Sequence, residues 1–317
     1  MQNSYLRGIP WKNFMDFISP GADRYALLKE TIEEAELEYT VLDMAESRHF
    51  LVTPVLSSGP SLELSSRLSS RLSSELSSRL PSGQIRQSIL VAHYDRAAGS
   101  PGANDNSAGV FLLIETAMKL KQSGAKNWMV AFTDKEELKS GESIQSQGAY
   151  ALALGLKNTK MQNSRIFSFD SCGIGDTLII STTAEHLLKN ESGGEKMQRS
   201  LKELRKFALD TARELNLNKV LLAPTPFSDD LGFFRAGLAA LTITMLPSSE
   251  CIRYVSELRR NPEFAESLIN AEFRQNSLTG SIPETWRSLN TPGDSHIRLT
   301  PKNFRNVIRF AENLCKG

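Results

Sequence analysis

The segment SILVAHYDRAAGSPGANDNSAG, residues 88–109, decides how the whole chain is interpreted. Its apolar residues 89–92 predict a short buried strand, and His93 and Asp95 follow at the carboxyl end of that strand. Side chains two positions apart on a strand point to the same side, so His93 and Asp95 are predicted to lie together. In this spacing a carboxylate can orient an imidazole that binds a metal ion through its other nitrogen.

The second half of the segment predicts a loop that leads into a helix. Gly, Pro and Ser residues precede Asp105, and residues 108–120 have the composition of a buried helix with Asn106 or Ser107 as its N-terminal cap. Asp105 is therefore expected between a strand end and a helix start, where ligands collect in α/β sheets. A lone His-x-Asp pair is weak evidence of a site, so the interpretation depends on whether other strands also end in acidic residues.

Two other predicted strands do end in acidic residues. Residues 127–133 lead to Glu136 and Glu137, and residues 165–169 are followed by Asp170. Because ligands bind beyond the carboxyl ends of parallel strands, these side chains are expected to converge on one crevice. Clustered carboxylates repel one another unless a cation lies among them. Carboxylates with one imidazole suit zinc, with manganese or cobalt as alternatives, and a bridging carboxylate can hold two ions.

The adjacent pair Glu136 and Glu137 indicates the type of chemistry. Neighbouring side chains at a strand end point in different directions, so one carboxylate can bind a metal ion while the other faces the attacking water. The second carboxylate can then take a proton from water that the metal has made more acidic. This combination of groups is suited to the hydrolysis of an amide bond.

The rest of the chain predicts an α/β fold. The sequence has 317 residues, of which 40% are apolar, and this is normal for one α/β enzyme with a sizeable core. Apolar strands alternate with predicted helices at 24–39, 108–120, 148–156, 197–215 and 301–315. This alternation predicts a three-layer α/β/α sandwich with a mostly parallel central sheet, formed as a single domain over residues 1–317.

Two regions depart from that alternation. The repeat LSSRLSSRLSSELSSRL at 64–80 predicts a low-complexity insertion loop over residues 61–83, with a partner-docking helix as the alternative. The polar helical region 248–284 is expected to form a lobe beside the site.

Composition argues against several classes of function. The net charge is +1, from 37 basic and 36 acidic residues, which gives no indication of binding to nucleic acid or to a membrane surface. The three cysteines form no CxxC pair and predict no disulfide framework. Neither a signal peptide nor a membrane-spanning apolar run is recognisable, so a cytoplasmic protein is expected. Nothing in the sequence indicates the oligomeric state.

Five motifs resemble those of the zinc-dependent exopeptidases of clan MH, which include bacterial leucyl aminopeptidases and have glutaminyl cyclases as relatives. They are AHYD (92–95), GANDNSAG (102–109), FTDKEE (132–137), FSFD (167–170) and NTPGDS (290–295), in the order and spacing of that family. The resemblance implies a phosphorylase/hydrolase-like fold, one or two zinc ions, and a peptide substrate that loses its N-terminal residue.

The resemblance also implies a role for each matching residue. The metal ligands would be His93, Asp170, Asp105 and Glu137. His93 and Asp170 would bind one ion and Glu137 the other. Asp105 would bridge both ions. Asp95 would orient His93 from behind. Glu136 would be the general base that later donates the proton to the leaving amine.

The last motif departs from the family pattern. The position before Thr-Pro-x-Asp is usually a histidine that completes the second metal site, and here it is Asn290. Three interpretations stay open. His296 could reach the site through a rearranged loop; Asn290 could bind weakly, with the second ion loose or absent; or the protein could keep the fold without activity. The intact pair of Glu136 and Glu137 favours an active enzyme.

Further departures bear on the substrate and the reaction. The SDH phrase common in the family is Ser228-Asp229-Asp230 here, and Asp229 or Asp230 is a candidate to hold the free substrate amine. The tryptophan-histidine pair of glutaminyl cyclases is Trp286-Arg287 here. The sequence therefore predicts an aminopeptidase, with a single-zinc glutaminyl cyclase-like enzyme or a catalytically degenerate binding protein as alternatives.

Overall fold

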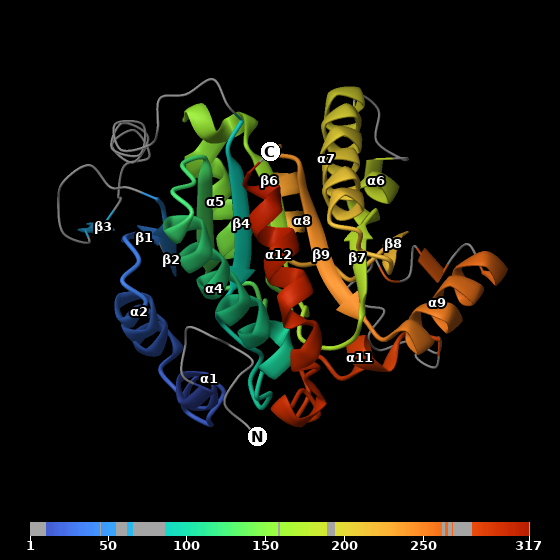
Figure 1. Ribbon diagram of the computed structural model, residues 1–317, viewed down its shortest axis with the longest axis horizontal. Helices are drawn as coiled ribbons and strands as arrows, with labels where there is room; N and C mark the ends of the chain where they lie inside the picture. Colours follow the sequence, from blue (N-terminus) through green and yellow to red (C-terminus); the bar gives the residue numbers. More distant parts are fainter. Residues whose placement is uncertain are drawn as a thin grey trace.

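The structure is a computed structural model that describes residues 11–44, 46–54, 62–65, 86–157, 159–188, 194–261, 264–265, 268 and 281–316. The described strands form a nine-stranded sheet in the order β3-β1-β2-β5-β4-β6-β9-β7-β8, and helices cover both of its faces (Figure 1). The expected three-layer α/β/α sandwich with a mostly parallel sheet is thus confirmed.

Four parallel strands form the centre of the sheet: β5 (Trp128–Thr133), β4 (Ser88–His93), β6 (Arg165–Phe169) and β9 (Ala240–Leu246). Every residue of β4, β5 and β9 is buried, as expected for strands that are covered on both faces. His93 is paired in register with Thr133, and Val91 with Ser168. The residues that follow these three strands therefore emerge at the same edge of the sheet.

The sheet continues on both sides with strands of mixed direction. On one side β2 (Ser47–Val52) is antiparallel to β5 and to β1 (Tyr39–Met44), and β1 is parallel to β3 (Leu62–Ser65). On the other side β7 (Thr177–Ser181) is antiparallel to β9 and parallel to β8 (Val220–Ala223). The centre, where the acidic strand ends lie, is the part of the sheet in which adjacent strands are all parallel.

Alternate residues of the central strands pack into the two helical layers. Leu90 and Ala92 join one core cluster, whereas Ile89 and Val91 join the other. The first layer comprises α1 (Trp11–Phe17), α2 (Arg24–Glu34), α4 (Ala108–Gln122), α6 (Thr183–Leu188), α7 (Glu195–Glu214) and α12 (Phe304–Leu314). The second comprises α5 (Gly148–Lys157) and α8 (Asp229–Arg235), with α9 (Ser248–Arg260) and α11 (Glu284–Arg287) beside β7 and β8. Short helical turns are η1 (Ala103–Ser107), η2 (Ile144–Ser146), η3 (Lys160–Asn163), η5 (His296–Arg298) and η6 (Pro301–Asn303).

The predicted helix at 24–39 is shorter in the structure. Helix α2 ends at Glu34, because Glu36 adopts a positive φ of 51° and the N–H of Leu37 bonds back to the carbonyl of Ile32. This closing turn satisfies the last carbonyls of the helix and redirects the chain so that Tyr39 begins β1.

Two predicted regions are described only in part. Most of the predicted insertion at 61–83 lies outside the described residues, and residues 62–65 within it form β3. In the predicted lobe at 248–284, α9 covers residues 248–260, whereas 262–263, 266–267 and 269–280 lie outside the described residues. None of the helices in the described part of the chain combines the length and apolar character that a membrane crossing requires.

Candidate metal centre

His93 ends β4 and is buried at the carboxyl edge of the sheet. Its Nε2 lies 3.1 Å from Oδ1 of Asp105 and 3.7 Å from Oδ2 of Asp170, the residue directly after β6. One potential ligand atom from each of the three residues lies within 4.8 Å of the other two. Among the described residues, no other His, Cys, Asp and Glu side chains form such a group.

The surroundings of His93 fit a divalent cation. Neither ring nitrogen makes an aligned hydrogen bond to a described residue, although both atoms are buried. Buried polar atoms normally have partners, and carboxylates that converge on one point repel each other unless a positive charge lies among them. Burial alone would lower the pKa of His93, but Asp105, Asp170 and Asp95 hold that pKa well above its ordinary value. A cation between the imidazole and the two carboxylates would supply the missing charge.

Asp95 connects the imidazole to the turn after β5. Its Oδ1 lies 3.3 Å from Nδ1 of His93, on the opposite side of the ring from Asp105. The same carboxylate accepts the backbone N–H groups of Glu136 at 3.1 Å and Glu137 at 3.0 Å. Although burial raises its pKa, His93 and these two N–H groups bring the pKa of Asp95 below its ordinary value. Asp95 thus keeps a negative charge behind His93 and positions both glutamates.

The turn that carries Asp105 is held by two side chains from distant parts of the chain. The carboxylate of Asp294 accepts the N–H groups of Asn104 at 2.9 Å and Asp105 at 3.0 Å. Asn106, joined to Asp105 by a cis peptide bond, donates from Nδ2 to the carbonyl of Phe169 at 2.8 Å. These contacts tie the Asp105 turn to the end of β6, next to Asp170.

Helix α4 starts close behind this turn, and its first residues are adapted to the contact. A Cβ atom at Gly109 would lie 2.8 Å from the carbonyl oxygen of Phe169, so glycine is needed for this approach. Ser107 occupies the N-cap position, but its side chain makes no capping bond, contrary to the prediction. The N–H of Ser107 bonds to the carbonyl of Gly102, and the Ser107 hydroxyl donates to the same carbonyl.

Arg24 also supports the site, although nothing in the sequence indicates this role. Its buried guanidinium donates to the carbonyls of Tyr94 and Asp95, each at 3.0 Å, and to that of Pro101 at 3.0 Å. It also donates to the hydroxyl of Ser107 at 2.7 Å. The loop from His93 to Asp105 is therefore closed around one guanidinium. In the sequence, Arg24 is a charged residue at the start of an amphipathic helix, and this pattern predicts that its side chain is exposed.

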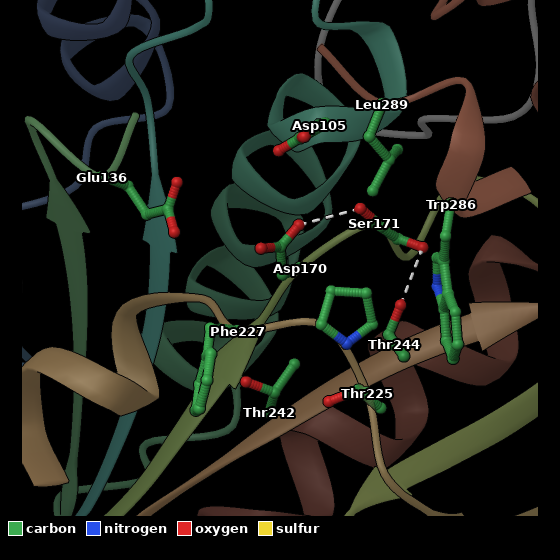
Figure 2. A pocket seen from close by; sticks show the side chains of 11 residues that line it. Asp105, Glu136, Asp170, Ser171, Thr225, Phe227, Thr242, Thr244, Trp286 and Leu289 are labelled. Atoms are coloured by element: carbon green, nitrogen blue, oxygen red, sulfur yellow. Dashed lines mark hydrogen bonds between the residues drawn. The ribbon is translucent and has the colours of Figure 1, made fainter. Parts of the chain in front are cut away.

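Glu136 faces the same cavity as Asp105 and Asp170 (Figure 2). Its Oε1 accepts a hydrogen bond from Nε2 of Gln147 at 3.3 Å. Burial raises the pKa of Glu136 well above its ordinary value; nearby carboxylates add to this effect, and His93 opposes it. A cation in the centre would also oppose it. Glu136 therefore has the position and the environment of a group that exchanges protons.

The remaining predicted ligands are arranged differently. Glu137 follows Glu136 on the turn held by Asp95, but its carboxylate does not belong to the three-residue group. Asn290 has a left-handed backbone with φ of 60°, and its buried Oδ1 has no aligned hydrogen bond to a described residue. His296 begins η5 and is also outside the group. The structure thus brings together His93, Asp105 and Asp170 but not Glu137 or His296.

Asp229 and Asp230 lie at the start of α8 and are buried. Oδ2 of Asp229 accepts a hydrogen bond from the hydroxyl of Thr133 at 2.8 Å, and Asp230 accepts the N–H of Ser228 at 3.1 Å. Burial raises the pKa of each carboxyl to about 7. Neither residue lines the cavity, so a substrate amine in the cavity would not touch them directly.

The cavity, together with the open solvent that adjoins it, has about 350 Å³ of space. Figure 2 shows Asp105, Glu136 and Asp170 on one side of it and threonines on the other. The full lining consists of Asp105, Glu136, Asp170, Ser171, Thr225, Pro226, Phe227, Thr242, Thr244, Trp286 and Leu289. The candidate metal centre therefore adjoins a cavity that is in contact with solvent.

Comparison with known proteins then identifies the family. The model of peptidase family M28 matches residues 78–288. The chain belongs to peptidase family M28. This confirms the predicted resemblance to zinc-dependent exopeptidases. A search of curated protein sequences found no match to the chain.

Solved structures share the M28 chain's fold at low sequence identity. A leucine aminopeptidase precursor from Bacteroides thetaiotaomicron is 15% identical, with a TM-score of 0.58 and coverage of 98% of this chain and 94% of the other. A glutaminyl cyclase from the same organism, bound to N-acetylhistamine, is 14% identical, with a TM-score of 0.58 and coverage of 98% and 95%. BSAP, a zinc aminopeptidase from Bacillus subtilis, is 16% identical, with a TM-score of 0.48 and coverage of 84% and 49%. The chain thus spans about half the length of that aminopeptidase.

The boundaries of the M28 match separate the predicted site residues into two groups. His93, Asp105 and Asp170 lie within residues 78–288, as do Glu136 and Glu137. The motif NTPGDS, with Asn290 and Asp294, lies beyond the matched residues, and so does His296. The family model therefore covers the three-residue group but not the segment that contains Asn290 and His296.

Proposed function

We propose that this chain is a metal-dependent exopeptidase that acts as an aminopeptidase and releases N-terminal residues from peptides. The observation that carries the proposal is that His93, Asp105 and Asp170 converge beside a cavity that Glu136 also faces. Membership of a peptidase family supports peptides as substrates. The three carboxyl groups of the cavity lining suit the positively charged end of a chain rather than its middle.

His93, Asp105 and Asp170 would hold a zinc ion, or manganese or cobalt, and Glu137 would help to hold a second one. An ion bound there supplies Lewis acidity toward water and the scissile carbonyl. Asp95 keeps Nδ1 of His93 occupied from behind, at 3.3 Å, so that Nε2 points toward Asp105 and Asp170. Asp95 also holds the backbone of Glu136 and Glu137, which couples the position of the base to that of the imidazole.

Glu136 would take the proton from the attacking water and pass it to the nitrogen of the leaving amine. Its Oε1 is held by Gln147, which leaves the other carboxylate oxygen for the substrate side. The free amine of the substrate would be attracted by the carboxyl groups of the cavity lining, which belong to Asp105, Glu136 and Asp170. Asp229 and Asp230 would act on that amine only through their charge, because they do not line the cavity.

The test is the Glu136→Gln variant of the zinc-loaded protein, assayed with aminoacyl amides. We expect turnover to fall by about 100-fold or more, the scale of a lost general base, while zinc content stays unchanged. Glu142→Gln is the matched control, because Glu142 lies on the same connection, near Lys135 at 3.7 Å, and does not line the cavity. Full activity of Glu136→Gln would overturn the proposed role.

One observation favours a second candidate, a single-zinc enzyme that resembles glutaminyl cyclases. The described residues offer one group of three ligands, and Asn290 stands where a second site would be completed. Peptides with N-terminal glutamine separate the two functions by mass. Release of free glutamine supports the aminopeptidase, whereas loss of ammonia from the intact peptide supports the cyclase. A protein that does neither and binds less than one ion per chain would be a degenerate member of the family.

A further inference from the structure

Three threonines form the side of the cavity that faces away from the candidate metal centre (Figure 2). Thr242 and Thr244 lie two positions apart on β9 and thus share one face of that strand. Thr225 comes from the connection between β8 and α8. All three side chains are at most 2% exposed, so their hydroxyl groups meet little bulk water.

The hydrogen bonds of these threonines leave oxygen acceptors on the cavity side. The Thr225 hydroxyl donates to Oγ of Ser181 at 2.7 Å, and the Thr244 hydroxyl donates to the carbonyl of Ser171 at 3.3 Å. A hydroxyl that has donated its proton keeps lone pairs that can accept. Thr242 makes no aligned hydrogen bond to a described residue, and its hydroxyl lies close enough to Asp230 to lower the pKa of that carboxyl. Thr242 is thus the least firmly bonded of the three threonines, and a hydroxyl turned toward Asp230 also keeps lone pairs that can accept.

The rest of the lining sets the size and charge of what can enter. Phe227, Trp286 and Leu289 supply apolar walls, and Trp286 is held in place by the ring of Tyr254, 5.2 Å away at 80°. The charged residues of the lining are all acidic and lie at the metal side. An acidic side chain would be repelled there, and a basic one would lose its hydration among the threonine hydroxyls.

We infer that this cavity selects peptides whose first residue has an uncharged side chain ending in a hydrogen-bond donor, such as threonine, asparagine or glutamine. The inference rests on the proposed function and adds a substrate class to it. A donor on the substrate would satisfy the hydroxyls that an apolar side chain of the same shape would leave buried and unpaired. Sites with buried polar groups discriminate strongly against an analogue that lacks the matching group.

The test uses pairs of aminoacyl amides that differ in polarity but hardly in shape: threonine against valine, asparagine against leucine, and glutamine against methionine. We expect kcat/KM to be about tenfold or more higher for the polar member of each pair, on the scale of one satisfied hydrogen bond. Glutamine products are identified by mass, so that cyclisation is not counted as hydrolysis. Equal rates, or faster turnover of the apolar members, would overturn the inference and leave the aminopeptidase proposal intact.

The Thr242→Val variant removes the least firmly bonded hydroxyl with almost no change in volume. We expect the preference for the polar member of each pair to fall by about tenfold. Thr40→Val is the matched control, because Thr40 is a buried threonine on β1, outside the cavity lining, and its variant should keep the wild-type preference. An unchanged preference in folded Thr242→Val contradicts the inference. If that variant does not fold, the substrate pairs on the wild-type protein remain decisive.

Binding without turnover separates this inference from the proposed function. Calorimetric titration of the zinc-loaded protein with free L-threonine and L-valine should show threonine binding about tenfold more tightly. If threonine binds better but no amide is hydrolysed, the aminopeptidase proposal fails and the selectivity of the cavity stands. Equal affinities, or no detectable binding of either amino acid, would count against the selectivity whatever the activity.

Discussion

Two regions of the candidate metal centre differ in how their ligands are held. On one side, His93 and Asp170 follow central strands, and Asp105 is carried by a turn that Asp294 and Asn106 fasten. On the other side, Asn290 and His296 lie at the two ends of a segment of turns, and their side chains do not join the three-residue group.

The difference shows that the two potential metal positions do not depend equally on the fold. Strand ends and backbone contacts bring the first three candidate ligands close together. The resemblance to the family implies that a second position needs a ligand from the turn segment, and in this chain that segment provides an amide at Asn290 instead of an imidazole. We therefore expect the first position to bind an ion more tightly than the second.

The strongest way to break the comparison is the His93→Ala variant. Removing the imidazole leaves Asp105 and Asp170 facing each other without their nitrogen partner, so we expect zinc affinity to fall by more than about 100-fold, beyond the effect of losing an outer contact. Zinc content is measured by elemental analysis of protein purified without chelators. His296→Ala is the comparison variant. An unchanged zinc content in His93→Ala would contradict the assignment of the first site.

The Asp294→Asn variant tests whether the turn contacts prepare the first site. An asparagine has one acceptor oxygen and so can accept only one of the two N–H groups from Asn104 and Asp105. We expect zinc affinity to weaken by about 10–100-fold, the usual cost of losing a group that orients a ligand. Asp176→Asn is the control, because Asp176 accepts the N–H of Ser248 at 2.8 Å away from the cavity. Equal zinc affinities in the Asp294→Asn and Asp176→Asn variants would contradict a role of Asp294 in preparing the first site.

Asn290→His sharpens the comparison on the weaker side. If the turn segment lacks only the right ligand, the variant should bind a second ion about tenfold more tightly than the wild type, with a rise toward two ions per chain. The His296→Asn variant of the wild-type chain shows whether that histidine already fills the role. If wild-type protein holds two ions and loses one in His296→Asn, the second site is completed through a rearranged loop.

His49 offers the mildest test, because it is a second buried histidine without converging carboxylates. It lies on β2, with Nε2 3.0 Å from the hydroxyl of Ser47 and Nδ1 3.3 Å from the N–H of Asp134. Burial lowers its pKa from 6.5 to about 4, and the charge of Asp95 opposes this only in part. We therefore expect His49→Gln to leave the zinc content unchanged.

The same residue makes a prediction about stability and pH. Between pH 6.5 and about 4 the unfolded chain binds a proton at His49 that the folded chain does not bind, so the free energy of unfolding decreases as the pH falls through this window. The loss attributable to His49 is at most about 3 kcal/mol, from 1.36 kcal/mol per pKa unit. Denaturant titrations of wild type and His49→Gln at several pH values measure it. Parallel pH profiles for the two proteins would rule out this contribution.

Much of the site was predictable because it depends on local patterns. Apolar runs that end in His93 and Asp170 mark central parallel strands, and such strands bring their carboxyl ends to one edge. The turn that carries Asp105 follows from its place between β4 and α4. Of the two predicted caps, Asn106 and Ser107, Ser107 occupies the N-cap position, but its hydroxyl donates to the carbonyl of Gly102 instead of capping α4.

The supporting residues were not predictable, because their partners are far away in the sequence. Asp294 holds Asp105 across 189 positions, and Arg24 reaches Pro101 across 77 positions. In the sequence, Thr242 and Thr244 look like ordinary strand residues. Their place in the cavity lining becomes visible only when the other elements of the fold surround them. Only the motif NTPGDS gave a signal for Asp294, and nothing local distinguished Arg24 from an exposed arginine.

The fold class and the family could be predicted from the sequence alone, because each depends on the order of residue types along the chain, and the same order named the candidate metal ligands. The tertiary structure decided which of those residues meet. It joined His93, Asp105 and Asp170, left Glu137 and His296 outside the group, and gathered three threonines at the far side of the cavity. The physical reason is that burial and convergence arise between elements, and a linear pattern does not contain the distances between them.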